Sequence, residues 1–343
     1  MAAPTTPDTQ GPPRPDLDAG LKYWNAVAQK DVSNNAVLGG LFSFSPSLSV
    51  LAFSASLPRV DAMGSRMFIL TMRPELSRIP SPCQTKAEDE RKQGGARRLY
   101  RALDVGAGIG RVTADVLLYL FDRIDLVEPV SAFIESGKHN ATSGKWSPSL
   151  RADKAVRFWN TSIQAFLPCL APSNHPSVTP LSSSIVGPEN DWNDGSGYDV
   201  IWAQWTLGHL TDEELVQFLQ KCKAALRPPS RSPSGNDSVL NQKDGDGALL
   251  QPTFERDGGL IIIKENIYVS PSDPDGDNVL FDEEDSSVTR SILFFIQFHY
   301  QKLPSSHSAF LRIFRLAGLH LVKQDLQRGF DPDLYKVHFY ALQ

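Results

Sequence analysis

Cysteine and histidine are both scarce and scattered in this sequence of 343 residues. The three cysteines, Cys83, Cys169 and Cys222, stand far apart and form no closely spaced pair. Neither a disulfide framework nor a thiolate metal site is therefore indicated, and we expect a reducing compartment. The seven histidines form no His-x3-His pair, so we expect no structural metal.

An excess of positive charge is also missing. The formal net charge is -5 and the sequence pI is near 5.8. Proteins that bind nucleic acid or anionic membranes carry basic clusters, so we expect neither partner. The sequence opens with MAAPTTPDTQGPPRPD, which has no charged region followed by an apolar core, so residues 1–20 are predicted to be a disordered tail and not a secretory signal.

A membrane-spanning helix is not expected either. Residues 41–57 carry no charge, but the run is shorter than the roughly 20 apolar residues that a spanning helix needs. It is also interrupted by a proline and rich in serine. We expect a cytoplasmic protein that is present in the nucleus as well.

Short apolar runs bounded by polar or glycine residues alternate with helical patterns along the chain. The runs read as strands are RRLYRALDVG, RIDLVEP, AVRFWN, YDVIWAQ and GGLIIIKEN, followed by the pair HLVKQDLQ and LYKVHFYAL. The helical patterns are RVTADVLLYLF, TDEELVQFLQKCKAAL, which Thr211 would cap, and AFLRIFRLAGL, which Gly318 would end. The fold class is therefore α/β, with a mostly parallel seven-stranded sheet that ends in an antiparallel hairpin.

Three stretches have the composition of insertions. Residues 79–95, 171–197 and 228–258 are rich in Pro, Ser, Gly, Asn and charge, and we expect them to be disordered. The remainder, residues 21–343, is predicted to form one domain.

The stretch ALDVGAGIGRVT places three glycines between a predicted strand and a predicted helix. Such a loop exposes backbone N–H groups at the positive end of a helix, which favours an anionic or polar ligand. A dinucleotide fingerprint requires glycine at the sixth position, where this loop has Arg111, and a phosphate loop requires Gly-Lys-Ser/Thr, where it has Gly110, Arg111 and Val112. Both of these ligand classes are disfavoured.

S-adenosylmethionine (SAM) fits the remaining features. Asp104 stands just before the loop, and Glu128 ends the next strand eighteen residues after Gly110. An acid at that position accepts hydrogen bonds from ribose hydroxyls in nucleoside-binding α/β folds. The loop arginine would then meet the carboxylate of the amino-acid end of SAM.

Four longer motifs extend this reading. LDVGAGIGRVT, YDVIWAQWTLGHLTDEELVQFLQKCKAALRP, IIIKEN and FDEEDSSVTR closely resemble the eukaryotic protein α-N-terminal methyltransferases. The resemblance runs from LKYWNAV at Leu21 to the C-terminus and is interrupted by the insertions. It implies a class I, Rossmann-like SAM-dependent methyltransferase with a helical substrate-binding extension at residues 21–78. Its substrates would be proteins that begin X-Pro-Lys, such as ribosomal proteins, mono-, di- or trimethylated on the α-amine, and we expect a monomer.

The resemblance also implies roles for individual residues of the cofactor site. Gly106, Gly108 and Arg111 would hold the methionine end of SAM, and Glu128 would bind the ribose where relatives often have Asp. Three further residues would complete the site: Ile163 and Gln164 beside the adenine and Gln204 closing the pocket.

On the substrate side, the resemblance implies a second group of residues. Tyr23 and Trp24 would lie near the peptide entrance, and Trp205 would pack on the proline. The remaining roles fall to Asn266 on the N-terminal residue, His209 and Asp285 on the amine, Asp282 on the lysine and Ser287 on the peptide. Taken without the motifs, Trp205 could be a core aromatic, His209 a helix cap and the DEED sequence a solvated acidic turn.

The amine itself sets a modest demand on the enzyme. A free α-amine has a pKa of roughly 7.8, so about one molecule in seven is neutral at pH 7, at a cost of about 1 kcal/mol. A lysine amine would cost about 4.6 kcal/mol. A weak base therefore suffices, and His209 and Asp285 are both candidate proton acceptors.

Two uncharged or aromatic segments interrupt the resemblance. Residues 41–57 separate VLGG from its expected continuation, and residues 292–309 separate SSVTRS from FLRIFRLAGL. They are either translated intron sequence or lineage-specific insertions. If they disable the enzyme, the chain would be a SAM-binding protein that acts by interaction; a methyltransferase of lysine or of a small molecule is the other alternative.

Overall fold

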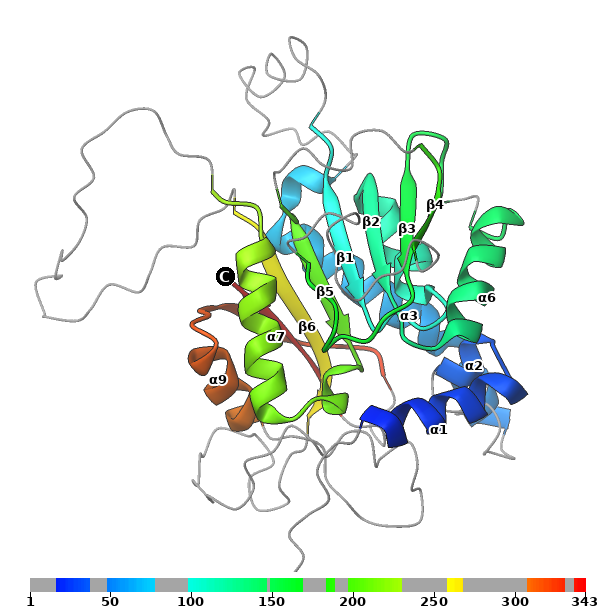
Figure 1. The fold of residues 1–343 in the computed structure, drawn as a ribbon, viewed down its shortest axis with the longest axis horizontal. Helices are drawn as coiled ribbons and strands as arrows, with labels where there is room; N and C mark the ends of the chain where they lie inside the picture. The colour runs from blue at the N-terminus through cyan, green and yellow to red at the C-terminus, as the bar shows by residue number, and fades with distance from the viewer. Residues whose placement is uncertain are drawn as a thin grey trace, which may run out of the picture.

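A twisted eight-stranded sheet forms the centre of the computed structural model, which describes residues 17–37, 48–77, 98–146, 149–168, 183–188, 197–229, 258–267, 307–330 and 336–343. The strand order is β4-β3-β2-β1-β5-β6-β8-β7 (Figure 1). The bounds are β1 Arg101–Val105, β2 Arg123–Val127, β3 Ala155–Trp159, β4 Ser183–Val186, β5 Val200–Gln204, β6 Leu260–Ile267, β7 Leu321–Leu326 and β8 Lys336–Leu342.

The sheet confirms the predicted α/β class. Strands β3, β2, β1, β5 and β6 run parallel, and β8 is antiparallel to both β6 and β7. The predicted number of seven strands is wrong by one, because β4 pairs antiparallel with β3 at the edge. This strand lies inside residues 171–197, and its four residues, SSIV, gave no strand signal among the surrounding serines and prolines.

Helices cover both faces of the sheet. Their bounds are α1 Leu17–Lys30, α2 Asn34–Val37, α3 Leu48–Met72, α5 Leu118–Leu120, α6 Ser131–Thr142, α7 Asp212–Ala225 and α9 His307–Leu316, with short turns η2 Pro74–Leu76, η3 Thr113–Leu117 and η5 Leu207–His209. Helices α7 and α9 lie in front of the sheet in Figure 1, and α3 lies behind it. Two separate hydrophobic clusters fill these layers, so the sheet is buried on both sides.

The central strands divide their side chains between the two clusters by simple alternation. In β5, Ile201 and Ala203 belong to the cluster with α7 and α9, whereas Val200 and Trp202 belong to the cluster with α3. Helix α7 begins as predicted, since the Thr211 hydroxyl accepts from the Glu214 backbone N–H and the Glu214 carboxylate accepts from the Thr211 N–H. The capping box thus fixes the start of α7, a few residues after β5 ends.

Two described helices extend into the segments that interrupt the resemblance. Helix α3 begins at Leu48, inside residues 41–57, and α9 begins at His307, inside residues 292–309. Helix α3 continues through Pro58 to Met72 and packs on the sheet. Within the described part of the chain, no helix combines the length and the apolar character needed to cross a membrane.

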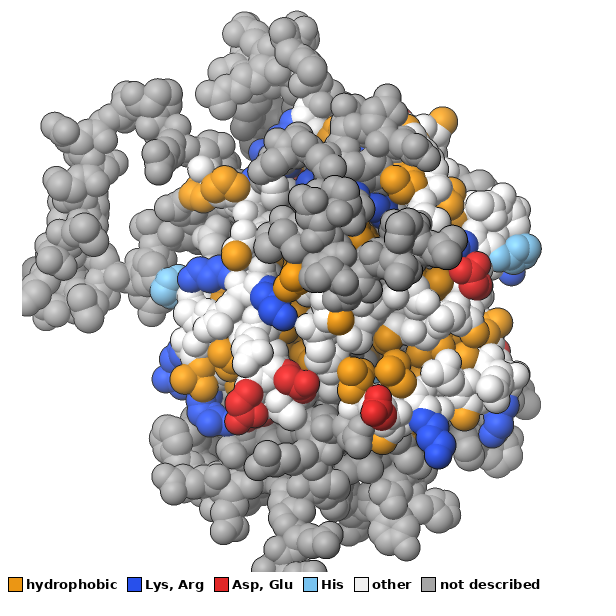
Figure 2. Space-filling view, viewed as in Figure 1, with side chains coloured by type: hydrophobic (Ala, Val, Ile, Leu, Met, Phe, Trp, Pro, Cys, Tyr) orange, Lys and Arg blue, Asp and Glu red, His pale blue; other side chains and the backbone are white. Residues whose placement is uncertain are grey.

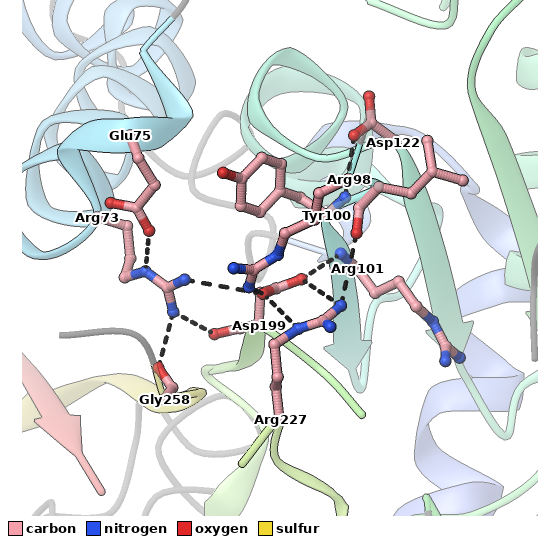
Figure 3. Close-up of polar contacts among 10 residues, drawn as sticks. Arg73, Glu75, Arg98, Tyr100, Arg101, Asp122, Asp199, Arg227 and Gly258 are labelled. Atoms are coloured by element: carbon pink, nitrogen blue, oxygen red, sulfur yellow. Dashed lines mark hydrogen bonds and ion pairs between the residues drawn. The ribbon is translucent and has the colours of Figure 1, made fainter. Parts of the chain in front are cut away.

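A buried carboxylate organises the end of the sheet where β1 and β5 begin. Asp199 accepts from Arg98 Nη2 at 2.5 Å, Arg227 Nε at 2.8 Å and the Arg101 backbone N–H at 2.8 Å (Figure 3). Arg73 reaches the same place from the end of α3 and donates to the Asp199 carbonyl at 3.3 Å. The Asp199 cluster, meaning Asp199 with Arg73, Arg98 and Arg227, thus ties α3 to the starts of the central strands.

Candidate active site

A pocket opens at the opposite end of the sheet, where β1, β2 and β5 finish. It is lined by the glycine loop, the residues that follow those strands, and helix α1: Leu17, Gly20, Leu21, Trp24, Asp104, Gly106, Ala107, Gly108, Arg111, Val112, Glu128, Pro129, Val130, Phe133, Ser162, Ile163, Gln164, Gln204, Trp205, Thr206 and His209. The carboxyl ends of parallel strands are the usual ligand-binding edge of an open α/β sheet.

The glycine loop requires its glycines for backbone conformation and for space. Gly106, Gly108 and Gly110 have φ angles of 63°, 57° and 81°, which L side chains rarely adopt. A Cβ on Gly106 would lie 2.0 Å from the Thr206 hydroxyl oxygen, and one on Gly110 would lie 2.6 Å from the Trp146 ring. The loop therefore packs directly against the chain that follows β5.

Glu128 is a buried carboxylate on the pocket wall. Its two oxygens accept from the Gly108 N–H at 2.9 Å and the Val130 N–H at 2.8 Å. Burial raises the pKa of Glu128 to about 7, against the lowering effect of these backbone hydrogen bonds. A carboxylate held by dipoles retains acceptor capacity for hydroxyl groups of a ligand.

The predicted adenine residues lie on a neighbouring part of the wall. Ile163 is buried and packs into the core, and Gln164 lines the pocket beside it. The Gln164 Nε2 group is buried and has no hydrogen-bond partner among the described residues. A buried amide donor without a partner is available to an acceptor atom of a ligand.

Arg111 and Gln204 both line the pocket and both bind Asp61 of α3. Arg111 Nη1 donates to Asp61 Oδ2 at 2.7 Å, and Gln204 Nε2 donates to the two Asp61 oxygens at 3.0 and 3.1 Å. Lys264 of β6 forms an ion pair with the same carboxylate. Asp61 and Lys264 were not predicted from the sequence. The available signal for Lys264 was its charge within the apolar strand IIIKEN.

Trp205 has a strained backbone. Its φ of 54° is the one positive value among the described non-glycine residues. The Trp205 N–H donates to the Lys264 carbonyl at 3.2 Å, and the indole N–H is buried without a hydrogen-bond partner in the described structure. The Arg111 guanidinium lies 5.5 Å from the centre of the Trp205 ring. Trp205 is therefore held at the wall of the pocket, beside the glycine-loop arginine.

The turn after Trp205 wraps around a second buried acid that sequence reasoning missed. Glu265 of β6 accepts from the Thr206 N–H at 2.9 Å and the Leu207 N–H at 3.1 Å. Burial raises the pKa of Glu265 to about 7, opposed by these backbone hydrogen bonds. Glu265 thus fixes the turn that carries Trp205 and His209.

His209 is covered by helix α1. The Trp24 indole N–H donates to His209 Nε2 at 3.2 Å, so the ring proton of the neutral imidazole is on Nδ1. A Cβ on Gly20 would lie 3.4 Å from Nδ1, so α1 leaves little space beside that nitrogen. Burial lowers the pKa of His209 to about 4, which keeps the imidazole neutral at pH 7.

The structure brings together most of the predicted site residues. Tyr23 packs edge-on against Trp24 with ring centroids 5.2 Å apart, but it does not line the pocket. Asn266 lies in β6 next to Glu265, also outside the lining. The predicted residues Asp282, Asp285 and Ser287 lie outside the described residues.

The chain matches the family described as AdoMet dependent proline di-methyltransferase over residues 16–231 and 253–343; AdoMet is SAM. It is 27% identical over 323 residues to alpha N-terminal protein methyltransferase 1 of Arabidopsis thaliana, covering 94% of this chain and 78% of that protein. The protein of the same name from Schizosaccharomyces pombe is 28% identical over 322 residues, covering 94% of this chain and 93% of the relative.

A solved structure supports the same assignment. A SAM-dependent methyltransferase from Leishmania major is similar at a TM-score of 0.52 and 25% identity, covering 95% of this chain and 82% of that one. The family match spans most of the sequence, and it includes the glycine loop, the turn after β5 and the C-terminal hairpin. The chain therefore belongs to the family of AdoMet-dependent proline di-methyltransferases.

Proposed function

We propose that this protein transfers methyl groups from SAM to the α-amine of proteins whose exposed N-terminus reads X-Pro-Lys. The observation that carries the proposal is the shared wall of the pocket, where Arg111 contacts Trp205 and His209 lies under Trp24. Relatives in Xenopus laevis and Danio rerio are named N-terminal Xaa-Pro-Lys N-methyltransferases and are 28% identical to this chain.

The residues of the pocket fit the parts of SAM. Arg111 offers a cation to the methionine carboxylate, Glu128 offers acceptors to the ribose hydroxyls, and the unpartnered Gln164 amide offers a donor to adenine. SAM supplies an electrophilic methyl group on a sulfonium. The protein's own task is to hold a neutral amine in line with that methyl group, because the nitrogen needs its lone pair for the displacement.

His209 is suited to orienting the amine and poorly suited to removing its proton. Its pKa is lowered by burial to about 4, and its Nε2 lone pair already accepts from Trp24. We therefore propose that Asp285 is the main proton acceptor, that Asn266 positions the N-terminal residue and that Asp282 binds the lysine. The acidic pair would favour a cationic peptide.

The wider biological context follows from the same proposal. Ribosomal proteins with X-Pro-Lys N-termini are candidate substrates, and the protein is proposed to act as a monomer in the cytoplasm and nucleus. On the face drawn in Figure 2, basic and acidic side chains are interspersed and no large surface of one sign forms among the described residues. That distribution agrees with a peptide substrate more than with a polyanion.

The test is incubation of the purified protein with isotopically labelled SAM and a Ser-Pro-Lys peptide, read by mass spectrometry. The N-acetylated peptide is the matched control, because it keeps the lysine and blocks the α-amine. We expect labelling of the free peptide alone. Equal labelling of both peptides would indicate lysine methylation, and labelling of neither would overturn the proposed activity on X-Pro-Lys peptides.

A further inference from the structure

Asp61 of helix α3 is the point at which distant parts of the chain meet behind the pocket. Its carboxylate is 0% exposed. It accepts from Arg111 of the glycine loop, Gln204 at the end of β5 and Lys264 of β6, which are 50, 143 and 203 residues away in the sequence. Among the described residues, Asp61 is the one carboxylate that forms hydrogen bonds or ion pairs with these three donors.

Asp61 lies one layer behind the residues that would touch a ligand. Arg111 and Gln204 line the pocket, whereas Asp61 and Lys264 do not. The Gln204 amide is fixed from both sides, because its Nε2 donates to Asp61 and its Oε1 accepts from Trp202 Nε1 at 3.2 Å. Asp61 can therefore act on a ligand through the orientation of Arg111 and Gln204.

The local charges make that orientation depend on Asp61. One buried anion serves two cations, Arg111 and Lys264. Lys264 has further acceptors, the Ser65 hydroxyl at 3.0 Å and Gln327 Oε1 at 2.8 Å. Arg111 donates to Asp61 and lies over the Trp205 ring, while Asp104 of the pocket wall and Asp115 act on it electrostatically from further away. Without Asp61, two buried cations would repel each other, and Arg111 is the one that can turn toward the pocket opening.

We propose that Asp61 is a positioning residue for methyl transfer: it holds Arg111 and Gln204 in the geometry that receives the amino-acid end of SAM. Helix α3 thereby becomes part of the cofactor site without touching the cofactor. The inference rests on the proposed placement of the methionine carboxylate at Arg111. A preorganised guanidinium loses less conformational freedom on binding, which is the source of the expected affinity.

If Asp61 had only an electrostatic role, Asp61→Asn would change the cofactor affinity in the opposite direction. If Asp61 only neutralised Arg111, then Asp61→Asn would remove a negative charge near the cofactor carboxylate and strengthen binding. If Asp61 positions Arg111, the same substitution weakens binding despite the lost negative charge. The direction of the change in affinity therefore separates the two roles.

The experiment measures, by calorimetry, the affinity of each variant for S-adenosylhomocysteine and for 5′-methylthioadenosine, which lacks the amino-acid end. For Asp61→Asn we expect about a tenfold loss of affinity for S-adenosylhomocysteine and less than a threefold change for methylthioadenosine. Tighter or unchanged binding of S-adenosylhomocysteine would overturn the proposal. An equal loss for both ligands would also overturn it, since general damage to the pocket does not depend on the amino-acid end.

Lys264→Met and the double variant Asp61→Asn/Lys264→Met are the matched controls. The single variant keeps the Asp61 to Arg111 pair and should bind both ligands like the unaltered protein. The double variant buries one charge fewer than Asp61→Asn alone, so it tests the proposal even if the single Asp61 variant does not fold. The double variant should still lose affinity for S-adenosylhomocysteine and keep its affinity for methylthioadenosine. Unaltered affinity for S-adenosylhomocysteine would mean that Asp61 serves only to pair with Lys264.

Arg111→Gln separates failure of this inference from failure of the proposed cofactor placement. If the placement is right, Arg111→Gln loses affinity for S-adenosylhomocysteine selectively, whatever Asp61→Asn does. If Arg111→Gln shows no selective loss, the placement and the inference both fail. If Arg111→Gln shows it and Asp61→Asn does not, the positioning role alone is wrong.

Discussion

Gly106 leaves no room for a side chain on the glycine loop, because the Thr206 side chain occupies the space where a Cβ would lie. We expect Gly106→Ala to lower SAM affinity by at least tenfold. A side chain is strained at a φ of 63°. The added methyl group would also lie only 2.0 Å from the Thr206 hydroxyl oxygen, so the Thr206 side chain would have to move. Calorimetry with SAM on the folded variant is the measurement.

Gly144 provides a matched control for the backbone effect. Its φ is 84°, but a Cβ there would meet nothing within 4 Å. Gly144→Ala should therefore lose stability through conformation alone, by about 1 kcal/mol, and keep its SAM affinity. If both variants bind SAM equally well, the contact between the glycine loop and Thr206 has no part in cofactor binding.

Glu128 should make cofactor affinity depend on pH. With its pKa raised by burial to about 7, Glu128 loses below neutrality the carboxylate form that is proposed to accept from ribose hydroxyls. SAM affinity should then fall by up to about tenfold per pH unit below pH 7. In Glu128→Gln we expect weaker binding with no such slope, measured by calorimetry from pH 5.5 to 8.5.

The raised pKa of Glu128 should also make the free energy of unfolding depend on pH, with stability lost as pH rises. The pKa of Glu128 rises from an ordinary 4.5 to about 7 in the folded, unliganded protein, so its stability contribution is present below pH 4.5 and lost as pH rises through 7. Glu128→Gln should raise the melting temperature at pH 8 and not at pH 4.5. Glu265, whose pKa is also raised to about 7, is present in both proteins, so the difference between them isolates Glu128. An unchanged melting temperature at pH 8 would mean that burial of Glu128 costs nothing.

At the scale of elements, the Trp24 to His209 hydrogen bond joins α1 to the turn after β5, and these two elements carry the proposed peptide entrance and the proposed amine site. We expect Trp24→Phe to raise the pKa of His209 from about 4 toward its ordinary 6.5, because the smaller ring buries the imidazole less and the N–H donor that favours the neutral ring is also gone. The peptide KM should rise several-fold while the SAM KM changes little. NMR titration of the imidazole and steady-state kinetics are the measurements.

Phe133→Leu is the control for packing around the same indole. Phe133 lies edge-on to Trp24 with ring centroids 6.2 Å apart, and its replacement keeps the Trp24 N–H. The pKa of His209 should remain low in this variant. A pKa that rises equally in both variants would indicate that burial, and not the hydrogen bond, controls the ring.

The elements that could be predicted from sequence are those specified by local pattern. Strand β1 reads as an apolar run before glycine, and α7 carries its capping box within four residues, Thr211 to Glu214. Strand β4 has no such pattern, since its pairing with β3 depends on an edge formed elsewhere in the chain. Element prediction therefore succeeds where the cause is local and fails where it is tertiary.

The residues of the candidate site also divide into those that a local motif indicates and those that depend on tertiary contacts. Motifs indicated Gly106, Arg111 and Glu128, and all three line the pocket. Asp61 and Glu265 were not predicted, because their roles depend on partners that are brought together only by folding. The positive φ of Trp205 was equally beyond prediction, since it results from the hydrogen bonds that hold both sides of the turn.

At the scale of the whole molecule, two buried carboxylates lie at opposite ends of the central strands. Asp61 lies behind the pocket, and Asp199 lies at the other end of β5 from Gln204, roughly 16 Å away at the usual rise per residue of a strand. Asp199 joins residues on either side of segments 78–97 and 230–257, which lie outside the described residues (Figure 3). Its role should be stability and not cofactor binding.

Asp199→Asn tests this separation. The carboxylate is buried and receives Arg98, Arg227 and, at 3.7 Å, Arg73 Nη2, so its neutralisation leaves three guanidinium groups around an uncharged amide. We expect a loss of roughly 3–5 kcal/mol in the free energy of unfolding, measured in urea, with SAM affinity within about twofold of the unaltered protein. Glu75→Gln is the matched control, because Glu75 pairs with Arg73 at the same end but its side chain is 39% exposed, so it should cost less than about 1 kcal/mol. Equal costs for the two variants would contradict the stabilising role of Asp199, and a large loss of SAM affinity in Asp199→Asn would show that the two ends of the sheet are coupled.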